Sequence, residues 1–357
     1  MTPAFILLNP GPINVSARVR RALAECQDQC HREPEALALQ TRVREKLVRA
    51  FGIAERYDAV LLTGSGTAAM EAMLASAVGK GVLVIDNGVY GDRLVQMAEA
   101  HRIPVLRHKV SWFERADPAA VRAALTDGPL ASTIDTVAVV HHETTPGLLN
   151  DLPAIAAVAQ AAGRRLLVDS VSGLAGETLD FGRVAPDAVC CTANKCIQGL
   201  PGIAFVLLKK GAPLVRRSVY LDLGLALAKQ SAGDTPFTPA IQVLAALEAA
   251  LDELLEETVA GRVARYRRAG ETVRAAATRL GLTMMLPPAL RSHSITSFKL
   301  PPGVGYPQIH DRMREDGFVI YGGQGDLSKT AFRIANMGLI PDDAWPRFER
   351  ALARAIR

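Results

Sequence analysis

Between about residues 58 and 210, short apolar runs alternate with alanine-rich runs, and this alternation limits the fold more than any other feature. The apolar runs have the length of β-strands, and nearly every residue in them is apolar, which is typical of strands buried on both faces. The alanine-rich runs between them have the length of helices. Strands that alternate with helices build parallel sheets that helices cover on both sides. The sequence therefore predicts an α/β fold around a mostly parallel sheet.

The pattern changes after about residue 257. A long helix is expected over 239–257, followed by a second over 262–280 that connects to the rest of the chain. Beyond it the sequence predicts strands over 293–300, 318–321 and 331–335, and helices over 306–316 and 342–356. We therefore expect a large domain over 16–257 and a smaller α+β domain over 258–357, which agrees with a length of 357 residues.

Composition excludes several classes of protein. Apolar residues make up 49% of the chain, which excludes a disordered protein. The longest apolar runs, such as 201–208, fall far short of the ~18 residues of a membrane span. The formal net charge of +5 is mild, and no nucleic-acid-reading module accompanies it. Residues 4–8 are too short for the apolar part of a signal peptide. We expect a cytoplasmic protein that binds neither membranes nor nucleic acid.

The cysteines and histidines do not suggest a metal site. None of the 5 cysteines forms a Cys-x-x-Cys pair. Cys190 and Cys191 lie in an apolar run and are expected to fill the core. His141 and His142 are adjacent, so in a strand they would point to opposite faces. We therefore expect no bound metal.

A small-residue loop follows the first expected strand. Gly64-Ser65-Gly66-Thr67 lies where the strand gives way to a helix. Glycine lets a backbone approach a ligand closely, and a helix N-terminus offers free N–H groups and the positive end of a dipole. The loop matches neither a P-loop nor a dinucleotide-binding fingerprint. It is either an anion-binding loop or an ordinary strand-to-helix turn.

Asp169 and Lys195 each follow an apolar strand. Asp169 ends the run 165–169, at the edge of the sheet where ligands bind in α/β folds. It could hold a protonated ring nitrogen or a metal, or cap a turn. Lys195 follows the run 188–192 among small residues, where an unpaired charge is costly. The alternative for Lys195 is an exposed hairpin lysine, a description that Lys209 and Lys210 fit better.

Taken together, the loop, the aspartate and the lysine specify a pyridoxal 5′-phosphate site. The lysine would form a Schiff base with the cofactor, and the aspartate would keep the pyridine nitrogen protonated. The loop and the helix end would hold the phosphate.

The chain resembles the class V aminotransferases of the fold-type I pyridoxal-phosphate superfamily over nearly its whole length. The matching segments are 7–12, 64–71, 87–93, 142–147 and 168–172. Within that class, 193–199 and 332–338 resemble the 2-aminoethylphosphonate transaminases. The resemblance implies the fold-type I architecture, with a large pyridoxal-phosphate domain around a mostly parallel sheet of the seven-stranded type and a smaller α+β C-terminal domain. It also implies an N-terminal arm over 1–15 that lies over the active site.

The resemblance also implies roles at the cofactor. Lys195 would bind the cofactor covalently and act as acid and base, and Asp169 would pair with the pyridine nitrogen. Tyr90 and Val171 would pack on opposite faces of the ring, and Thr144 would lie near the 3-hydroxyl. The remaining cofactor contacts implied are the phosphate-binding Ser65, Gly66 and Thr67, the flanking Asn194, and Thr238.

Thr238 matches a residue that reaches the phosphate of the neighbouring subunit, so a homodimer with shared active sites is expected. Arg333 matches the arginine that receives the substrate carboxylate, and its planar fork also suits a phosphonate. Asn9 and Gly11 belong to a loop that would close over the substrate. Arg32 could be a second anion receptor or an interface residue, and the sequence leaves both open.

The implied reaction moves the amino group of 2-aminoethylphosphonate to pyruvate, giving phosphonoacetaldehyde and L-alanine, or runs in reverse. The nearest alternative is an alanine–glyoxylate or serine–pyruvate transaminase. A cysteine desulfurase would need a reactive cysteine ahead of Arg333, but no cysteine follows Cys196. A scaffold that has lost its chemistry would not need both Lys195 and Asp169.

Overall fold

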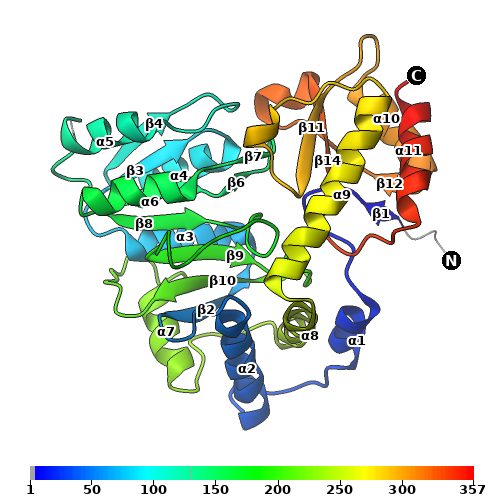
Figure 1. The fold of residues 1–357 in the computed structure, drawn as a ribbon. Coiled ribbons are helices and arrows are strands. Elements are labelled where there is room, and N and C mark those ends of the chain that lie inside the picture. The colour runs from blue at the N-terminus through cyan, green and yellow to red at the C-terminus, as the bar shows by residue number, and fades with distance from the viewer. Residues whose placement is uncertain (1–4, 129) are drawn as a thin grey trace.

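A seven-stranded sheet forms the centre of the computed structural model, which describes residues 5–128 and 130–357 (Figure 1). In spatial order its strands are β2 (Tyr57–Gly64), β10 (Gly202–Lys209), β9 (Ala188–Thr192), β8 (Arg165–Asp169), β5 (Thr136–Val140), β3 (Val82–Asp86) and β4 (Val105–Lys109). Only β10 runs against its neighbours, β2 and β9, while the other pairs are parallel. The mostly parallel α/β sheet predicted from the sequence is confirmed.

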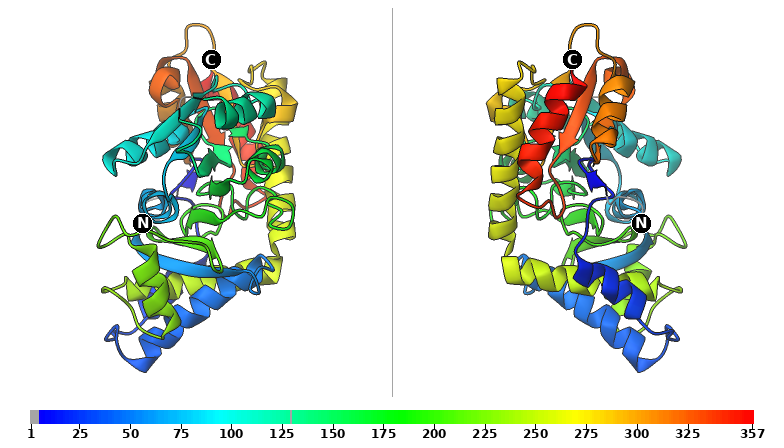
Figure 2. Two further views of the ribbon diagram at one scale, coloured as in Figure 1. Left: turned by 90° about the vertical axis from the view of Figure 1, so that its left-hand side faces the viewer. Right: turned by 90° about the vertical axis from the view of Figure 1, so that its right-hand side faces the viewer.

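Helices cover both faces of this sheet (Figures 1 and 2). One face packs against α3 (Gly66–Ala77), α4 (Val89–Ala100) and α7 (Leu223–Ser231). The other packs against α1 (Ala17–Glu25), α2 (Pro34–Ala50), α5 (Pro118–Thr126), α6 (Leu152–Ala161) and α8 (Ile241–Glu257). Alternate residues of β3 divide between two cores, with Leu83 and Ile85 in one and Val82 and Val84 in the other. This two-sided burial is why the strands are apolar throughout.

The carboxyl ends of the parallel strands lie along one edge of the sheet. Because β10 is antiparallel to both β2 and β9, these two strands share the direction of the rest. The segments that begin at Ser65, Asn87, His141, Ser170 and Ala193 therefore leave from this same edge. The topology alone brings the predicted functional segments together.

A second, three-stranded antiparallel sheet follows the long helices. Its strands are β11 (Ile295–Lys299), β14 (Ala331–Ala335) and β13 (Tyr321–Gly322), and its helices are α9 (Val259–Arg279), α10 (Tyr306–Glu315) and α11 (Ala344–Ala355). The short elements are β1 (Ile6–Leu7), β12 (Phe318–Val319), β6 (His142–Glu143), β7 (Leu148–Leu149), η1 (Pro288–Leu290) and η2 (Gly325–Lys329). No helix in the described ranges is long and apolar enough to span a membrane.

One expected strand, 318–321, is in fact two. β12 pairs with β1 of the N-terminal segment, whereas β13 pairs with β14. The residues before and after Ile320 pair with different strands, so the prediction of a single strand was wrong.

The two long helices α8 and α9 meet at Thr258. This residue ends α8, and its hydroxyl caps α9 by accepting a hydrogen bond from Gly261 N at 3.1 Å. The boundary expected between residues 257 and 258 falls at this junction, but the division into 1–15, 16–257 and 258–357 stays a prediction. Residues 1–4 of the expected arm lie outside the described residues.

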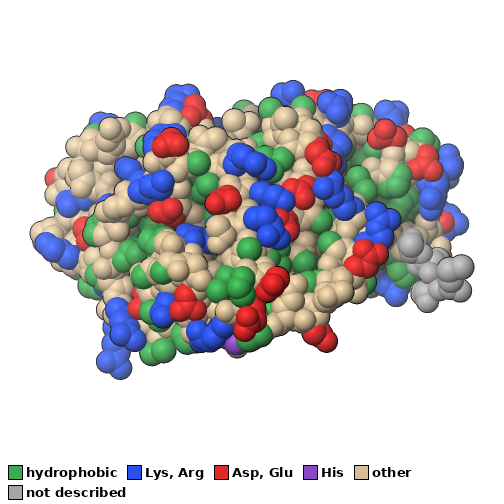
Figure 3. All heavy atoms as spheres, turned by 90° about the horizontal axis from the view of Figure 1, so that it is seen from below, with side chains coloured by type: hydrophobic (Ala, Val, Ile, Leu, Met, Phe, Trp, Pro, Cys, Tyr) green, Lys and Arg blue, Asp and Glu red, His purple; other side chains and the backbone are tan. Residues whose placement is uncertain are grey.

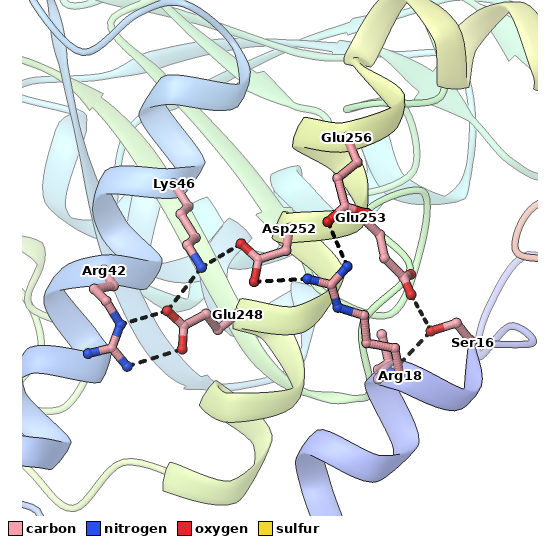
Figure 4. Close-up of polar contacts among 9 residues, drawn as sticks. Ser16, Arg18, Arg42, Lys46, Glu248, Asp252, Glu253 and Glu256 are labelled. Carbon is pink, nitrogen blue, oxygen red and sulfur yellow. Dashed lines mark hydrogen bonds and ion pairs between the residues drawn. The ribbon is translucent and has the colours of Figure 1, made fainter.

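Charged side chains join α8 to α1 and α2 (Figure 4). Lys46 lies between Glu248 at 3.0 Å and Asp252 at 2.5 Å. The other contacts are Arg42 with Glu248, Arg18 with Asp252 and Glu256, and the Ser16 hydroxyl with Glu253. Viewed from below, both signs of charge are interspersed over the surface (Figure 3). Exposed pairs of this kind contribute at most about 1 kcal/mol each, so the network mainly sets how these helices are oriented.

Candidate active site

The loop after β2 forms a small cup at the start of α3. Ser65 is the N-cap residue, yet its hydroxyl makes no capping hydrogen bond within the described chain. The first hydrogen bond of α3 comes from Ala68 N, so the N–H groups of Gly66 and Thr67 precede it without a helical acceptor. A Cβ on Gly66 would lie 2.8 Å from Val171 Cγ1, which explains the glycine. Free N–H groups and the helix dipole suit this cup to an anion.

Asp169 is held by one of its two carboxylate oxygens. Oδ1 accepts a hydrogen bond from Val171 N at 2.9 Å and lies 3.6 Å from Cys190 Sγ. Among the described residues, no group donates to Oδ2. Burial raises the pKa of Asp169 to about 6, while the Val171 N–H, the Cys190 thiol and the nearby Lys195 and Arg93 oppose the rise. The carboxylate is therefore mostly ionised at neutral pH and keeps one oxygen for a cationic N–H.

Lys195 lies just beyond β9 and is partly buried. Its Nζ forms neither an ion pair nor a hydrogen bond with any residue in the described ranges. Burial lowers the pKa of Lys195 to about 8, and the neighbouring Arg333 adds to the decrease, whereas Asp169 opposes it. A buried amine that is partly neutral near physiological pH can act as a nucleophile.

The residues after Lys195 are fixed to α9 by buried side chains that the sequence did not reveal. Arg262 is 1% exposed and donates from Nη1 to the carbonyls of Cys196 at 3.2 Å and Ile197 at 2.9 Å. The hydroxyl of Tyr266 accepts hydrogen bonds from Gln198 Nε2 at 2.6 Å and from Gly338 N at 3.0 Å. These contacts tie the lysine loop to the chain just after β14.

Arg333 lies in β14 and is 4% exposed. Its Nε donates to Gly322 O at 2.9 Å, and its Nη1 donates to Thr144 O at 3.2 Å. No carboxylate pairs with it in the described chain, and Nη2 makes no hydrogen bond there. Burial lowers the pKa of Arg333. The guanidinium is thus fixed by two backbone carbonyls and retains N–H groups for an anion.

Thr144 and its neighbours lie between the two sheets. The Thr144 hydroxyl is buried, and no residue of the described chain forms a hydrogen bond with it. The carbonyl of the next residue, Thr145, accepts a hydrogen bond from Ser297 of β11 at 3.1 Å. The segment therefore contacts the smaller sheet while presenting an unpartnered hydroxyl.

Tyr90 lies in the first turn of α4, and Arg93 lies one turn further along. The Arg93 guanidinium carbon is 4.8 Å from the centre of the Tyr90 ring, and Nη1 is 3.4 Å from Thr67 Oγ1. Arg93 forms no ion pair with the described residues. Sequence reasoning gave Arg93 no role, although the residue falls inside the matching segment 87–93.

The N-terminal loop reaches Lys195. The backbone of Gly11 has φ +116, and a Cβ there would lie 3.1 Å from Lys195 Cδ and 3.2 Å from Lys195 Cε. Asn9 is buried, and its side-chain amide donates a hydrogen bond within its own loop, to Pro12 O at 2.8 Å. Asn194 accepts a hydrogen bond from the Thr192 hydroxyl at 2.8 Å. Gly11 is thus packed against the lysine, as expected of a loop that covers the site.

Thr238 and Arg32 lie in a different neighbourhood. Thr238 lines a pocket with Thr63, Tyr220 and Phe237. Arg32 is exposed and ion-pairs with Asp234 at 3.2 Å, at the start of the loop that leads to Thr238. The structure gives neither residue a hydrogen bond to the cup or to Lys195 within the described chain.

The residues present fit pyridoxal phosphate. The orphaned Thr144 hydroxyl suits a ring hydroxyl, and Asp169 Oδ2 suits a protonated ring nitrogen. The amine of Lys195 suits an aldehyde, and the cup at Ser65, Gly66 and Thr67 suits a phosphate. Four separate groups of the cofactor therefore have a chemically matched partner in one site.

Gly11→Ala tests the contact between the N-terminal loop and the lysine. The new methyl group would collide with Lys195 and would also be strained at a positive φ. We expect the fraction of protein that borohydride links covalently to pyridoxal phosphate to decrease at least ~10-fold at a fixed cofactor concentration. Gly52→Ala is the matched control, because Gly52 also has a positive φ but nothing lies within 4 Å of its Cβ position. Equal losses in both variants would show that strain alone is responsible.

Comparison with known proteins agrees with this site. Residues 12–323 match the family described as aminotransferase class-V. A 2-aminoethylphosphonate–pyruvate transaminase from Aeromonas hydrophila is 36% identical, over 99% of this chain and 94% of that protein. A protein of the same name from Syntrophobacter fumaroxidans is 36% identical over 95% of this chain and 93% of its own length.

Solved structures share the fold over the whole chain. An alanine–glyoxylate aminotransferase from Nostoc sp. superposes with a TM-score of 0.92 at 26% identity, covering 100% of this chain and 96% of that one. An aspartate aminotransferase from Thermus thermophilus superposes with a TM-score of 0.88 at 29% identity, covering 98% of both chains. The predicted fold-type I architecture, the cofactor and the aminotransferase class are confirmed. This chain belongs to the class V aminotransferase family of pyridoxal-phosphate enzymes.

Proposed function

We propose that this aminotransferase moves the amino group of 2-aminoethylphosphonate to pyruvate, giving phosphonoacetaldehyde and L-alanine, or catalyses the reverse. The observation that carries the proposal is a partly buried amine close to a buried guanidinium, neither with a counter-ion in the described chain. Lys195 and Arg333 are near enough for the charge of Arg333 to lower the pKa of Lys195. A substrate with an amine at one end and an anion at the other matches this pair. The relatives named for that reaction support the choice of amine.

The bound cofactor supplies an aldehyde for amines and a ring that takes up the electron pair left when a C–H bond breaks. The residues of the chain bind, orient and move protons around it. Asp169 Oδ2 holds the proton on the ring nitrogen. Lys195 Nζ accepts the proton from the substrate Cα atom and returns one. Tyr90 and Val171 keep the ring between them, and the hydroxyl of Thr144 holds the ring hydroxyl.

Arg333 would bind the anionic end of the substrate. Its Nη2 and the second N–H of Nη1 lie side by side, which suits two oxygens of a carboxylate or a phosphonate. The same group can therefore receive the phosphonate of the donor and the carboxylate of pyruvate in turn. Holding the substrate at this end also orients the breaking Cα–H bond relative to the ring. Asn9 and Gly11 would close the site from the N-terminal side.

An alanine–glyoxylate or serine–pyruvate reaction is the alternative. The likeness to the Nostoc enzyme favours it, because that structure superposes over the full chain. The site chemistry is shared by both reactions, since glycine, serine and alanine also combine an amine with an anion. The two functions differ in the amines and 2-oxo acids that the pocket accepts.

Reaction of the protein with separate amines distinguishes the two functions. We expect 2-aminoethylphosphonate and L-alanine to convert bound pyridoxal phosphate rapidly to the pyridoxamine form, and glycine and L-serine to do so slowly. Stopped-flow absorbance in single-turnover mixtures measures each rate, and Lys195→Ala is the control that should convert with none. Rapid conversion by glycine or serine without a response to 2-aminoethylphosphonate would reject the phosphonate reaction.

The lowered pKa of Lys195 predicts how cofactor capture depends on pH. Only the neutral amine attacks an aldehyde, and the pKa of Lys195 is lowered from 10.5 to about 8. The rate at which cofactor-free protein captures pyridoxal phosphate should therefore rise up to about pH 8 and level off above it. Absorbance at a series of pH values measures this rate. A rate that keeps rising toward pH 10.5 would contradict a neutral buried amine.

We also propose a homodimer in which Thr238 completes the phosphate site of the partner chain. Thr238 lines a pocket that includes Thr63, two residues before Ser65, yet it has no hydrogen bond to the cup in the described chain, which supports a role at the cup of a partner chain. The Arg32–Asp234 pair at the start of its loop also supports this. Thr238→Ala should weaken cofactor binding about tenfold, the effect of one lost charge-assisted hydrogen bond. Equilibrium dialysis measures the binding.

Mixed dimers make the test of Thr238 decisive. A dimer of one Lys195→Ala chain and one Thr238→Ala chain contains one intact site only if Thr238 acts across the interface. Co-refolded mixtures should then regain about one tight, borohydride-reducible site per mixed dimer. Mixtures without any such site would place Thr238 in its own chain. The cytoplasmic location stays a prediction from the sequence, which cell fractionation would check.

A further inference from the structure

Helix α4 is capped from outside its own sequence. Three other helices take their cap from an aspartate at the N-cap position, Asp117 for α5, Asp151 for α6 and Asp222 for α7. The N-cap residue of α4 is Gly88, which has no side chain to offer. The first N–H groups of α4 bond instead to Glu143, which lies 52 residues further along the chain than Gly91.

The contact between Glu143 and α4 is close and fully buried. Glu143 Oε1 accepts a hydrogen bond from Gly91 N at 2.7 Å, and Oε2 accepts one from Tyr90 N at 3.3 Å. The side chain is 0% exposed. A Cβ on Gly88 would lie 2.4 Å from the carboxyl carbon of Glu143, so glycine is required there for the carboxylate to approach.

No lysine or arginine pairs with Glu143 within the described residues. Burial raises the pKa of Glu143 to about 8, and the nearby Asp169 and Asp86 add to the rise, while the N–H groups of Gly91 and Tyr90 oppose it. Both carboxyl oxygens accept a hydrogen bond from a backbone N–H group and both face the positive end of the α4 dipole, an arrangement that favours the ionised form. A cap needed only for stability could come from the N-cap position, as it does in α5, α6 and α7. The unusual source of this cap indicates that the contact serves to join two segments.

The two joined segments both belong to the active site. On one side, Glu143 binds the backbone of Tyr90, and one turn later Arg93 lies over the Tyr90 ring and reaches Thr67 of the cup. On the other side, Glu143 immediately precedes Thr144, whose carbonyl accepts a hydrogen bond from Arg333. A shift of Glu143 would therefore move the Tyr90 ring relative to both the cup and Arg333.

We propose that Glu143 is a positioning residue that sets where the Tyr90 ring packs against the cofactor, by holding the first turn of α4. The inference rests on the proposed stacking role of Tyr90 and does not depend on which amine the enzyme uses. A role in stability alone would not involve the Tyr90 ring. This proposal predicts that the effect of changing Glu143 on cofactor binding depends on that ring.

Glu143→Gln is the main variant, because glutamine keeps the volume but turns an N–H₂ group toward one of the two backbone donors. We expect it to raise the dissociation constant for pyridoxal phosphate about tenfold, as loss of one charge-assisted hydrogen bond would. The visible circular dichroism of the bound cofactor should fall with it, since that signal reports how the ring is packed. Both readouts are taken without substrate, so they are independent of the amine specificity.

A double-mutant cycle with Tyr90→Ala tests the route of the effect. Glu143→Gln should change cofactor affinity less than ~3-fold in the Tyr90→Ala background, because the ring that it positions is gone. An equal effect in both backgrounds would overturn the proposal, and so would no effect in either. If Tyr90→Ala alone leaves affinity and dichroism unchanged, the stacking role fails as well, and the two failures are thereby told apart.

Asp117→Ala is the matched control, since it removes the cap of α5 at the far end of the sheet. It should lower the unfolding temperature as a lost cap does, with unchanged cofactor affinity and dichroism. Equal changes in cofactor affinity for both variants would show a general loss of stability and overturn the proposal. Should Glu143→Gln fail to fold, Glu143→Asp keeps the charge, withdraws it by one methylene, and is expected to raise the dissociation constant by less.

Discussion

The amine of Lys195 is partly buried at the carboxyl end of β9 without a counter-ion in the described chain, and the active site is arranged around that constraint. An amine in such a place is costly when charged, and burial shifts its pKa down to about 8. Pairing it directly with Asp169 would relieve the cost but would also raise that pKa and remove the nucleophile. The structure instead holds the aspartate through Oδ1 by Val171 N, so that Asp169 is near enough to influence Lys195 yet forms no ion pair with it.

The other charged groups of the site follow the same rule, because each is held by backbone atoms. Arg333 donates to two carbonyls, and Glu143 accepts from two N–H groups. Arg262 donates to two carbonyls of the lysine loop as well, although it also forms an ion pair with Glu257 at 2.8 Å. Backbone partners fix a side chain in place without neutralising it as an opposite charge would. They also connect the two sheets, since Arg333 lies in β14 and its acceptor Thr144 follows β6. The geometry of the site therefore depends on how the smaller sheet packs against the carboxyl edge of the larger one.

The sequence predicted those parts of the molecule that follow from local pattern. Fully apolar strands identified the inner part of the large sheet, and their carboxyl ends placed the cup, Asp169 and Lys195 together. β4 was not predicted, because it is an edge strand whose residues include Arg107 and Lys109. It therefore lacks the apolar run that is typical of a buried strand. Arg333 was expected on a strand over 331–335, and the structure adds that every residue of this strand, β14, is buried. The role of Glu143 could not be predicted, because its partners are the backbone N–H groups of Tyr90 and Gly91. Every residue except proline has such a group, so the residue types do not indicate the contact. The only signal was Gly88 before a helix with no capping residue.

The proposed recognition of an anion by Arg333 would depend on charge more than on shape. The N–H groups that Arg333 retains can bind any anion with two accessible oxygens, which includes planar carboxylates and tetrahedral phosphonates. The surroundings of the guanidinium are aromatic, since the Tyr321 ring centre lies 5.8 Å from it, and Tyr90, Tyr321 and Tyr306 are near enough to oppose the decrease that burial causes in the pKa of Arg333. Tyr306 donates its hydroxyl proton to Ile320 O, so that proton is committed to the protein. The size and shape of the space between these rings and Arg333 would therefore determine which amines with an anionic end are accepted. Because Glu143 is proposed to position the Tyr90 ring, the size of that space would depend on the residues at the cofactor as well as on those at the substrate.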